Sequence, residues 1–473
     1  MPVTPFRVAV VGGGIAGLAA AHRLVEAGRE RGRPVAVTLF EASSRLGGTI
    51  QTERADGFLL EAGPDSFVSE KPWGLALAER VGLGPRLRRT DERYRRTYVV
   101  HGGRLHPLPE GFLLLAPTRL WPLVTSPLFS WRGKLRMALD LVLPRGDANG
   151  DESLARFVTR RLGREALERV AEPLVAGIYT ADPERLSLAA TMPRFLALER
   201  EHRSLILALR RGTTRREQAG ASGARWSLFV TLAGGMGELL EALVARLPAE
   251  AARLGCPVVA VLRDADDALW AVRLRDGHRV AADGVILAGQ APRMGELVRE
   301  ADPELARRLG EIPYASSASV SLAYPRAAIR HPLDGFGFVV PRREGRAALA
   351  CTFSSVKYPG RAPEGFALLR VFLGGALGDA VLEHDDATLI RLAHDDIAAL
   401  LGIESAPVLT RVSRHPAAMP QYEVGHLDRI GAIEARLAVL PGLAVAGSAY
   451  RGVGIADCIR SGEEAADRLL AGF

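Results

Sequence analysis

The chain has 473 residues, enough at about 100 to 200 residues per domain for two or three domains with substantial cores. Hydrophobic residues make up 48% and charged residues 24%, which excludes a disordered or collagen-like protein. The net charge is +7, but acidic residues interrupt the basic clusters, so we expect no nucleic-acid partner. The basic residues are almost all arginines, a bias that weakly supports an anionic partner.

The cysteines and histidines argue against a disulfide framework or a metal site. Cys256, Cys351 and Cys458 lie far apart and form no C-x-x-C pair, and the 10 histidines form no ligand-spaced cluster. No export signal precedes the first apolar run, and the apolar stretch 111–129 is too interrupted by proline and arginine to span a membrane. We expect a cytoplasmic protein and leave open a peripheral contact at the inner face of the cell membrane.

The N-terminal segment predicts a dinucleotide-binding unit. The apolar run 6–11 is typical of a buried parallel strand, and a helical segment follows it. Between them stand three glycines at the spacing that lets a backbone approach a pyrophosphate at a helix N-terminus: Gly12, Gly14 and Gly17. A second apolar strand, 35–40, ends in Glu41, whose carboxylate is suited to accept hydrogen bonds from a ribose.

The next residues favour a flavin over a nicotinamide cofactor. Arg45, Gly47 and Gly48 follow Glu41 closely. This extension resembles the R-x-G-G motif of the FAD-binding amine-oxidase superfamily, where the arginine and the glycine backbone reach toward the pyrophosphate. A further stretch is similar to the superfamily's loop near the flavin ring: Gly63, Pro64, Asp65 and Ser66.

The middle of the chain divides into a helical part and a strand-rich part. Residues 73–225 are mostly helical in pattern, with a polar loop at 213–224, and residues 311–415 predict a separate sheet that covers the flavin. Short strands at 258–262, 269–274 and 285–288 are predicted to complete the cofactor domain.

A second strand, glycine loop and helix appear near the C-terminus, over 443–447, 448–455 and 457–470. The N-terminus of such a helix can present backbone N–H groups to the electron-rich edge of a flavin. We therefore expect a discontinuous FAD-binding domain (1–72, 225–290 and 416–473), a mainly helical domain (73–224) and a substrate-binding sheet domain (291–415). The fold class is α/β, α+β overall: a Rossmann-like FAD domain of the amine-oxidase type, a mixed-sheet substrate domain and a helical insertion.

Taken together, these stretches resemble the FAD-dependent porphyrinogen oxidases of haem synthesis, which act on coproporphyrinogen III or protoporphyrinogen IX. The resemblance runs nearly end to end. Its specific pieces are Gly-Pro-Asp-Ser-Phe at 63–67, Gly-Ile-Tyr at 177–179 with Leu-Ser at 186–187, Glu-His-Arg-Ser-Leu at 201–205, Gly-Phe-Gly at 335–337, Met-Pro-Gln-Tyr at 419–422 with Gly-His at 425–426, and Gly-Val-Gly-Ile-Ala-Asp-Cys-Ile at 452–459.

The resemblance implies the site residues. FAD contacts are expected at the motif positions above and at Val258, Gly447, Val453, Gly454 and Ile455. The substrate cleft is expected to use the backbone carbonyl of Gly177 toward pyrrole N–H groups and apolar walls from Leu174, Phe336, Val339 and Phe372. An arginine that pairs with a propionate in some members falls at Arg96, with a one-residue shift left open. Ser448 departs from the acidic or amide residue that many flavin oxidases carry there.

The implied activity is the removal of six hydrogens from a porphyrinogen in three cycles, with dioxygen reduced to hydrogen peroxide. The flavin carries the redox chemistry, so we name no catalytic acid or base. Segments 105–109, 352–355 and 363–370 look more like the soluble oxidases of the coproporphyrin-dependent route, which narrowly favours coproporphyrinogen III over protoporphyrinogen IX.

Other functions stay open at this point. A flavin amine oxidase or a desaturase shares the cofactor motifs, and a flavin- or porphyrin-binding protein without turnover, one that delivers porphyrin to a ferrochelatase partner, is an alternative of another class. A disulfide reductase is disfavoured because the chain lacks a second dinucleotide motif and a cysteine pair. The sequence leaves the oligomeric state open.

Overall fold

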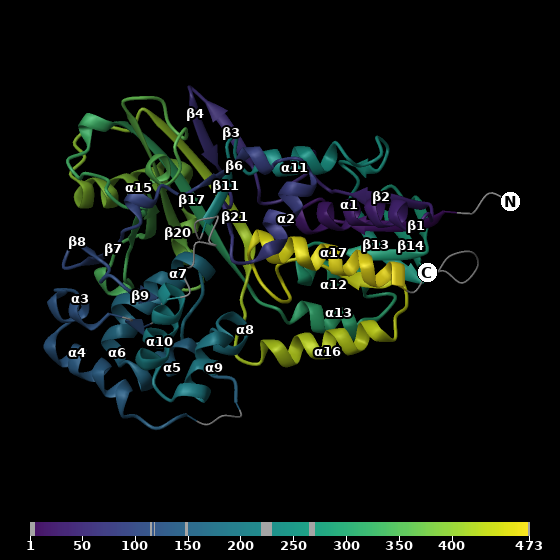
Figure 1. The fold of residues 1–473 in the computed structure, drawn as a ribbon. Helices are drawn as coiled ribbons and strands as arrows, with labels where there is room; N and C mark the ends of the chain where they lie inside the picture. The colour runs from purple at the N-terminus through teal and green to yellow at the C-terminus, as the bar shows by residue number, and fades with distance from the viewer. Residues whose placement is uncertain are drawn as a thin grey trace.

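The computed structural model describes residues 5–113, 116–117, 119–146, 150–218, 229–263 and 270–471. They form three lobes: an α/β lobe that contains both ends of the chain, a sheet lobe and a helical lobe (Figure 1). The predicted α/β class, with a mixed sheet and a helical region, is confirmed.

A five-stranded parallel sheet is the centre of the α/β lobe. Its order is β12-β2-β1-β16-β22, so strands from the start, the middle and the end of the chain pair side by side. The strands are almost wholly apolar because helices cover both faces of such a sheet. They are β1 (Phe6–Val11), β2 (Val35–Phe40), β12 (Ala252–Arg253), β16 (Gly284–Leu287) and β22 (Leu443–Val445).

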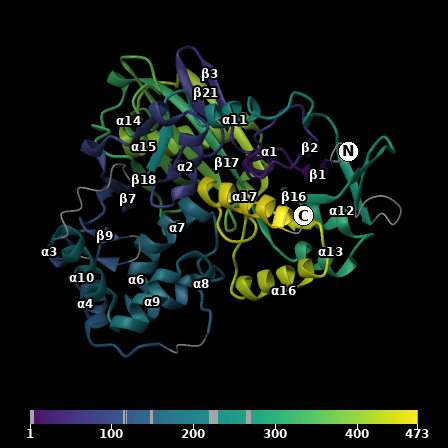
Figure 2. The same ribbon diagram turned by 45° about the vertical axis from the view of Figure 1, so that its right-hand side comes forward.

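Two helices from opposite ends of the chain pack together on this sheet. They are α1 (Ile15–Glu30) and α17 (Ile455–Ala471), and they lie side by side (Figures 1 and 2). A side chain at Gly462 would begin 2.2 Å from the carbonyl oxygen of Ala16, so glycine allows the two backbones to touch. This contact joins the first and last structural units of the chain.

The strands predicted to complete the cofactor domain pair in two sheets. β16 joins the parallel sheet, whereas β13 (Val258–Arg263) and β14 (Trp270–Leu274) pair with β15 (Arg279–Ala282) in an antiparallel sheet whose apolar side chains share a core with β1 and β16. Short strands joined by tight turns pair locally, whereas a parallel partner needs a long crossover. Residue 269, included in the prediction, lies outside the described residues.

The sheet lobe is built on seven strands in the order β21-β17-β20-β19-β18-β7-β8. Only the β18–β7 pair is parallel, so the sheet is mixed as expected. Helix α15 (Asp386–Leu401) packs its apolar stripe into the core of this lobe. The strands are β7 (Thr97–His101), β8 (Arg104–Pro107), β17 (Tyr314–Pro325), β18 (Gly337–Val339), β19 (Ala348–Thr352), β20 (Phe366–Gly374) and β21 (Leu409–Pro420).

The helical lobe has its own apolar core and a buried arginine, Arg161, that pairs with two buried carboxylates, those of Asp140 and Glu199. Ser204 donates to the Asp140 carboxylate at 2.7 Å. Helix α10 extends to Gln218, so the loop predicted from residue 213 is wrong for 213–218, while 219–224 lie outside the described residues. The lobe contains α3 (Leu120–Thr125), α4 (Trp131–Ala138), η3 (Leu139–Leu141), α5 (Leu154–Arg161), α6 (Arg164–Ala166), η4 (Leu167–Ala171), α7 (Glu172–Tyr179), α8 (Leu188–Thr191), α9 (Pro193–His202) and α10 (Leu205–Gln218).

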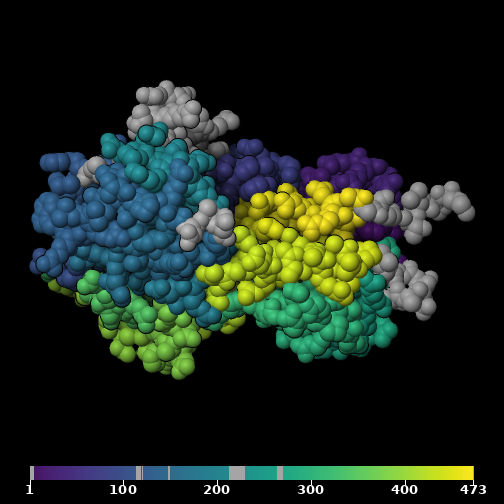
Figure 3. All heavy atoms as spheres, turned by 90° about the horizontal axis from the view of Figure 1, so that it is seen from below, coloured from purple at the N-terminus to yellow at the C-terminus, as the bar shows by residue number. Residues whose placement is uncertain are grey.

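Two pairs of elements lie in other lobes than the predicted domain limits imply. Strands β7 and β8 lie in the segment 73–224 but extend the seven-stranded sheet. Helices α12 (Ala291–Val298) and α13 (Pro303–Gly310) share a core with β1 and with α16 (His426–Ala438), and α13 and α16 lie together in the space-filling view (Figure 3). We therefore propose that residues 97–107 belong with the sheet lobe and 291–310 with the α/β lobe.

The remaining short elements connect the lobes. Strands β3 and β4 form a hairpin, and β5, β11 and β6 form a three-stranded sheet. They are β3 (Thr52–Ala55), β4 (Phe58–Glu61), β5 (Phe67–Val68), β6 (Leu87–Arg89) and β11 (Phe229–Leu232), with helices α2 (Pro72–Arg80) and α11 (Gly237–Val244) beside them.

Candidate functional site

The N-terminal glycine turn leaves no room for a side chain at two of its three motif glycines. A Cβ at Gly12, whose φ is 111°, would lie 2.7 Å from the carbonyl oxygen of Ala288, and one at Gly17 would lie 1.9 Å from that of Gly12. Gly14 is the N-cap of α1, and its own Cβ position is open. The first-turn N–H groups of α1 have no partners within the helix, so the turn is suited to an anionic group.

Glu41 lies beside this turn. One of its carboxylate oxygens accepts a hydrogen bond from the Gly13 N–H and the other from the Ser43 N–H, each at 2.8 Å. The Glu41 carbonyl accepts from Cys256 N–H at 2.9 Å, which brings the strand that starts at the buried Val258 close by. The carboxylate is thus held at the carboxyl end of β2, where a ribose hydroxyl could reach it.

The Arg45 segment folds against the same turn. Gly47 donates its N–H to the Gly13 carbonyl at 2.8 Å, and Gly47 and Gly48 both have positive φ. The Arg45 guanidinium donates to the carbonyls of Gly48 at 2.6 Å and Ile50 at 3.3 Å. The predicted pyrophosphate residues therefore come together in the structure.

The loop 61–66 lies next to that segment. A Cβ at Gly63 would be 1.8 Å from the Thr49 carbonyl oxygen, so the two loops are in contact. Asp65 accepts from Ser66 Oγ at 2.6 Å and pairs with Lys357 Nζ at 3.2 Å. Burial opposes ionisation of Asp65, but the charges of Lys357 and Arg370 prevail and lower its pKa to about 2. Pro64 is exposed.

The C-terminal glycine loop is held by side chains from elsewhere. Tyr422 donates its hydroxyl to the Ser448 carbonyl at 2.6 Å and accepts from Gly452 N–H at 2.7 Å. Gly447 donates its N–H to Ser461 Oγ at 3.0 Å. Val453 and Gly454 follow, and Ile455 begins α17.

The predicted substrate residues line one junction between the helical and sheet lobes. Leu174, Val339 and Phe372 pack in one apolar cluster, and Val453 of the C-terminal loop packs against it. Gly177 is exposed in the last turn of α7, and its Cβ position is 3.9 Å from both Val339 and Ala350. The carbonyls of a last helical turn lack partners within the helix, so that of Gly177 is suited to accept a hydrogen bond.

Arg96 and Phe336 lie further along the sheet lobe. Phe336 donates its N–H to the Arg96 carbonyl at 2.8 Å, and the Arg96 guanidinium pairs with Asp334 at 2.5 Å. Arg96 is half exposed, so a propionate would compete with Asp334 for it. Phe336 is partly buried and is not part of the cluster formed by the other apolar wall residues.

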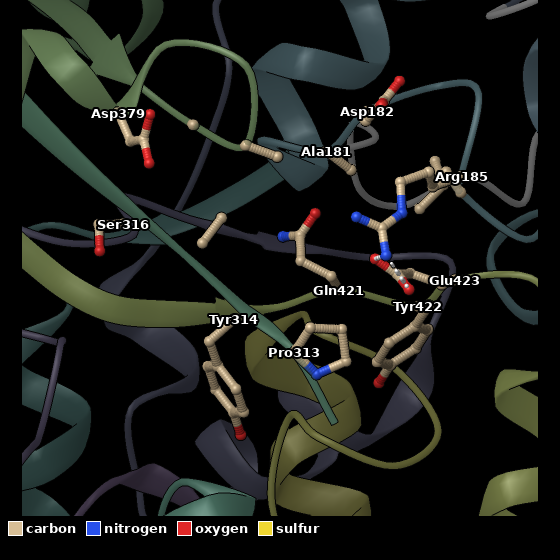
Figure 4. A pocket seen from close by; sticks show the side chains of 14 residues that line it. Ala181, Asp182, Arg185, Pro313, Tyr314, Ser316, Asp379, Gln421, Tyr422 and Glu423 are labelled. Atoms are coloured by element: carbon tan, nitrogen blue, oxygen red, sulfur yellow. Dashed lines mark hydrogen bonds and ion pairs between the residues drawn. The ribbon is translucent and has the colours of Figure 1, made fainter. Parts of the chain in front are cut away.

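A polar cavity of about 240 Å³ lies between segment 181–186 of the helical lobe, the start of β17, the turn after β20 and residues 421–423 (Figure 4). Arg185 and Glu423 form an ion pair at 2.8 Å on its wall, and Gln421 and Asp379 also line it (Figure 4). Its lining contains none of the residues predicted to bind FAD or substrate.

Several residues of the site escaped the sequence prediction. Tyr422 and His426, the latter stacked on the Tyr422 ring at 3.9 Å between centroids, support the C-terminal loop. Ser319, Arg370 and His415 contact the Ala62 carbonyl in the loop 61–66. Tyr422 and His426 belong to the Met-Pro-Gln-Tyr and Gly-His motifs. No local pattern indicates that their side chains form hydrogen bonds with the C-terminal glycine loop.

The residues present fit FAD. A Cβ at Gly12 or Gly17 would collide with the backbone of the glycine turn, the start of α1 offers N–H groups with no partner in the helix, and Glu41 adds a carboxylate beside them. No group of three His, Cys, Asp or Glu side chains converges on a metal-binding point within the described ranges. In the same part of the chain, none of the helices has the length and apolar character to cross a membrane.

Comparison with known families places the chain. The model of the flavin-containing amine oxidoreductases matches residues 15–470, from the first helix to the last. The chain belongs to this family. Membership confirms the predicted FAD cofactor and oxidoreductase class, and it explains why both ends of the chain contribute to one cofactor lobe.

Relatives over the full length confirm the resemblance to the porphyrinogen oxidases. A coproporphyrinogen III oxidase of Propionibacterium freudenreichii is 38% identical over 98% of this chain and 90% of its own. A protoporphyrinogen oxidase of Bos taurus is 34% identical over 98% of both chains. A crystal structure from Exiguobacterium sp. 255-15 is 31% identical and covers 100% of both chains with a TM-score of 0.86, which confirms the amine-oxidase type of fold.

Proposed function

We propose that this protein is an FAD-dependent oxidase that removes six hydrogens from a porphyrinogen and forms the porphyrin of haem biosynthesis. The observation that carries the proposal is an apolar cluster shared by the two predicted sites. Val453, in the loop expected to hold the flavin, packs against the same cluster that contains Val339 and against which Leu174 and Phe372 pack. A tetrapyrrole whose apolar macrocycle lies on those walls of the predicted substrate cleft would meet the cofactor.

The FAD-contacting residues we propose come from four segments. They are Gly12, Gly14, Gly17, Glu41, Arg45, Gly47 and Gly48 around the pyrophosphate and ribose, Val258 beside them, Gly63, Pro64, Asp65 and Ser66 near the ring, and Gly447, Val453, Gly454 and Ile455 at the C-terminal loop. When bound, FAD accepts the hydrogens of the substrate and passes them on to an acceptor.

The protein's part in the reaction is placement. Leu174, Val339, Phe336 and Phe372 bury the faces of the macrocycle, and the Gly177 carbonyl accepts a hydrogen bond from a pyrrole N–H. These groups hold the substrate against the loop 447–455 without titrating. No side-chain acid or base is needed to orient it.

We propose coproporphyrinogen III as the preferred substrate, with protoporphyrinogen IX as the alternative. The relatives compared above include oxidases named for each. Coproporphyrinogen III has four propionates and protoporphyrinogen IX has two. The basic residues of this chain are almost all arginines, and a guanidinium binds a carboxylate in a fork geometry, which supports the substrate with more carboxylates. Initial rates of porphyrin fluorescence with each porphyrinogen test this choice. Equal kcat/KM for the two would contradict it.

The same assay separates the rival functions. Peroxide release on adding a polyamine, without porphyrin formation, would identify an amine oxidase. Yellow protein that binds porphyrin and consumes no oxygen would identify a binding protein. We propose dioxygen as the acceptor, so one hydrogen peroxide should form for each pair of hydrogens removed.

We assign Arg96 to a substrate propionate. Arg96→Gln should raise KM for coproporphyrinogen about tenfold with little change in kcat, because a contact kept in both ground and transition states affects binding alone. The matched control is Arg414→Gln. Arg414 lies on β21, at the other edge of the sheet, and pairs with Asp386 of α15, so its loss should leave KM unchanged. An unchanged KM in Arg96→Gln would contradict the assignment of Arg96 to a substrate propionate.

We also propose a peripheral membrane contact through the helical lobe, at the inner face of the cell membrane. Trp121, Trp131 and Leu135 are 75%, 67% and 68% exposed, and the ammonium of Lys134 lies 4.7 Å from the Trp131 ring centroid. Exposed tryptophans beside basic groups are typical of surfaces that enter the headgroup region of anionic membranes. Trp121→Ser with Trp131→Ser should abolish sedimentation with phosphatidylglycerol vesicles. Val408→Ser, an exposed apolar control in another lobe, should not.

A ferrochelatase partner would receive the porphyrin product. We propose this partnership from the reaction alone, since a porphyrin released into water aggregates through its apolar faces. Co-sedimentation of the two purified proteins with and without coproporphyrin tests it, and no association in either condition would contradict it.

A further inference from the structure

The carbonyl of Ala62 accepts three hydrogen bonds from one sheet. Arg370 Nη2 and His415 Nε2 each donate at 2.9 Å, and Ser319 Oγ donates at 3.2 Å. A carbonyl has two lone pairs, so three donors exceed its usual number of partners. We call Ser319, Arg370 and His415 the Ala62 clamp.

The clamp comes from three neighbouring strands of the sheet lobe. Ser319 lies on β17, Arg370 on β20 and His415 on β21, and β17 pairs with both of the others. Arg370 is 6% exposed, and its Nε has no hydrogen-bond partner among the described residues. Burying a guanidinium with a donor unpaired is costly, so this arginine is not explained by packing alone.

A second cation reinforces the first. Lys357 pairs with both carboxylate oxygens of Asp65 at 3.2 Å, three residues after Ala62. On the other side of Ala62, Glu61 pairs with the buried Arg361 at 3.3 Å. Three cations therefore face two carboxylates along the loop 61–66, which leaves a net positive charge beneath it.

Arg370 also reaches the predicted substrate wall. Its guanidinium lies 4.8 Å from the ring centroid of Phe372, one of the apolar wall residues. The arginine thus spans from the loop expected to face the flavin ring to the cleft expected to hold the macrocycle. No sequence motif indicates this, because Ala62 and Arg370 are 308 residues apart.

We propose that Arg370 is a positioning residue that fixes the loop 61–66 through the Ala62 carbonyl and that, with Lys357, it raises the reduction potential of the bound FAD. The inference rests on the proposed placement of that loop beside the flavin ring. Two-electron reduction adds negative charge to a flavin, and a fixed cation in a poorly solvated region stabilises added negative charge more strongly than water-exposed cations do.

The test is the midpoint potential of the purified holoprotein, measured by dye equilibration. Arg370→Met should lower the ratio of reduced to oxidised FAD at a fixed potential about tenfold. For a two-electron couple this corresponds to a fall of about 30 mV in the midpoint potential. Arg370→Lys, which keeps the charge, should recover most of the loss. Arg414→Met, an exposed arginine on β21 of the same sheet, is the matched control and should leave the potential unchanged. A wild-type potential in Arg370→Met would overturn the inference.

A second variant covers the case in which Arg370→Met does not hold FAD. Lys357→Met removes the other cation while the Ala62 clamp stays in place. It should also lower the midpoint potential, so that the ratio of reduced to oxidised FAD at a fixed potential falls about threefold. An unchanged potential in Lys357→Met would then overturn the inference. Wild-type holoprotein that fails to oxidise either porphyrinogen would refute the proposed function, whereas turnover with unchanged potentials in the variants would refute the inference alone.

Discussion

The two strand–glycine–helix units of the α/β lobe are built by different means. The N-terminal unit turns from β1 to α1 in three residues, and its shape follows from backbone contacts that exclude a side chain at Gly12 and Gly17. The C-terminal unit takes residues 446–454 to pass from β22 to α17 and depends on hydrogen bonds with the side chains of Tyr422 and Ser461. The first is shaped by close backbone contacts, including one with Ala288, and the second by hydrogen bonds to side chains.

This difference predicts that Gly12 and Gly17 of the N-terminal unit tolerate no substitution. Gly17→Ala would place a Cβ 1.9 Å from the Gly12 carbonyl oxygen, so we expect a loss of more than about 4 kcal/mol and no yellow protein on purification. The control is Gly431→Ala in α16, an exposed helical glycine with nothing within 4 Å of its Cβ position, which should stabilise by about 0.5–1 kcal/mol. Soluble, FAD-loaded Gly17→Ala would contradict the steric argument.

The C-terminal loop should instead respond to acid. His426 is fully buried and donates to the Tyr450 carbonyl at 3.0 Å, and burial lowers its pKa to about 4. An unfolded histidine titrates near 6.5, so its contribution to stability is present above that pH and is lost as the pH falls toward 4, by about 3 kcal/mol in total. Melting temperatures of His426→Gln should therefore fall less between pH 7 and pH 5 than those of the wild type. The exposed His278→Gln should match the wild type, and an equal acid response in His426→Gln would contradict the assignment.

Removing the hydroxyl that bridges the loop should have a smaller effect. Tyr422→Phe keeps the ring stacked on His426 but leaves the Ser448 carbonyl and the Gly452 N–H without their partner, at a cost of about 1–3 kcal/mol. We expect a lower melting temperature and a raised Kd for FAD, measured by flavin fluorescence. Unchanged FAD affinity would separate this loop from the cofactor.

The smallest effect is expected at the start of the loop. Ser461→Ala removes one hydrogen bond, to the Gly447 N–H, and should destabilise by about 0.5–1.5 kcal/mol. Because Tyr422 and Ser461 hold opposite ends of one loop, the double variant should lose less than the sum of the two single losses if the loop opens as a unit, since each single variant already loses the shared cooperative part. Strict additivity would show that its ends move independently.

Sequence reasoning succeeded where the constraint was local. The apolar run of β1, the glycine spacing and the position of Glu41 each follow from neighbours within a few residues, and all were predicted. It did not indicate which strands pair with each other. Nothing in the apolar runs of β13 and β14 shows that they form an antiparallel sheet with β15, apart from the parallel sheet that β16 joins.

The contacts between lobes could not be predicted either, because their partners lie far apart in the sequence. Arg370 and His415 look like ordinary residues of alternating strands, and their bonds to Ala62 exist because β17, β20 and β21 carry them to one point. The pairing of β7 with β18 likewise joins segments about 240 residues apart, which no local periodicity can report.

The touching backbones of α1 and α17 have a consequence for biosynthesis. Strand β1 can pair with β2 as soon as both leave the ribosome, but α1 keeps an uncovered apolar face until α17 has been synthesised and Gly462 packs against Ala16. A nascent chain therefore carries an unfinished nucleotide-binding unit while the sheet lobe and the helical lobe are made. Capture of the cofactor must wait for α17, and a chain truncated before this helix should not retain FAD.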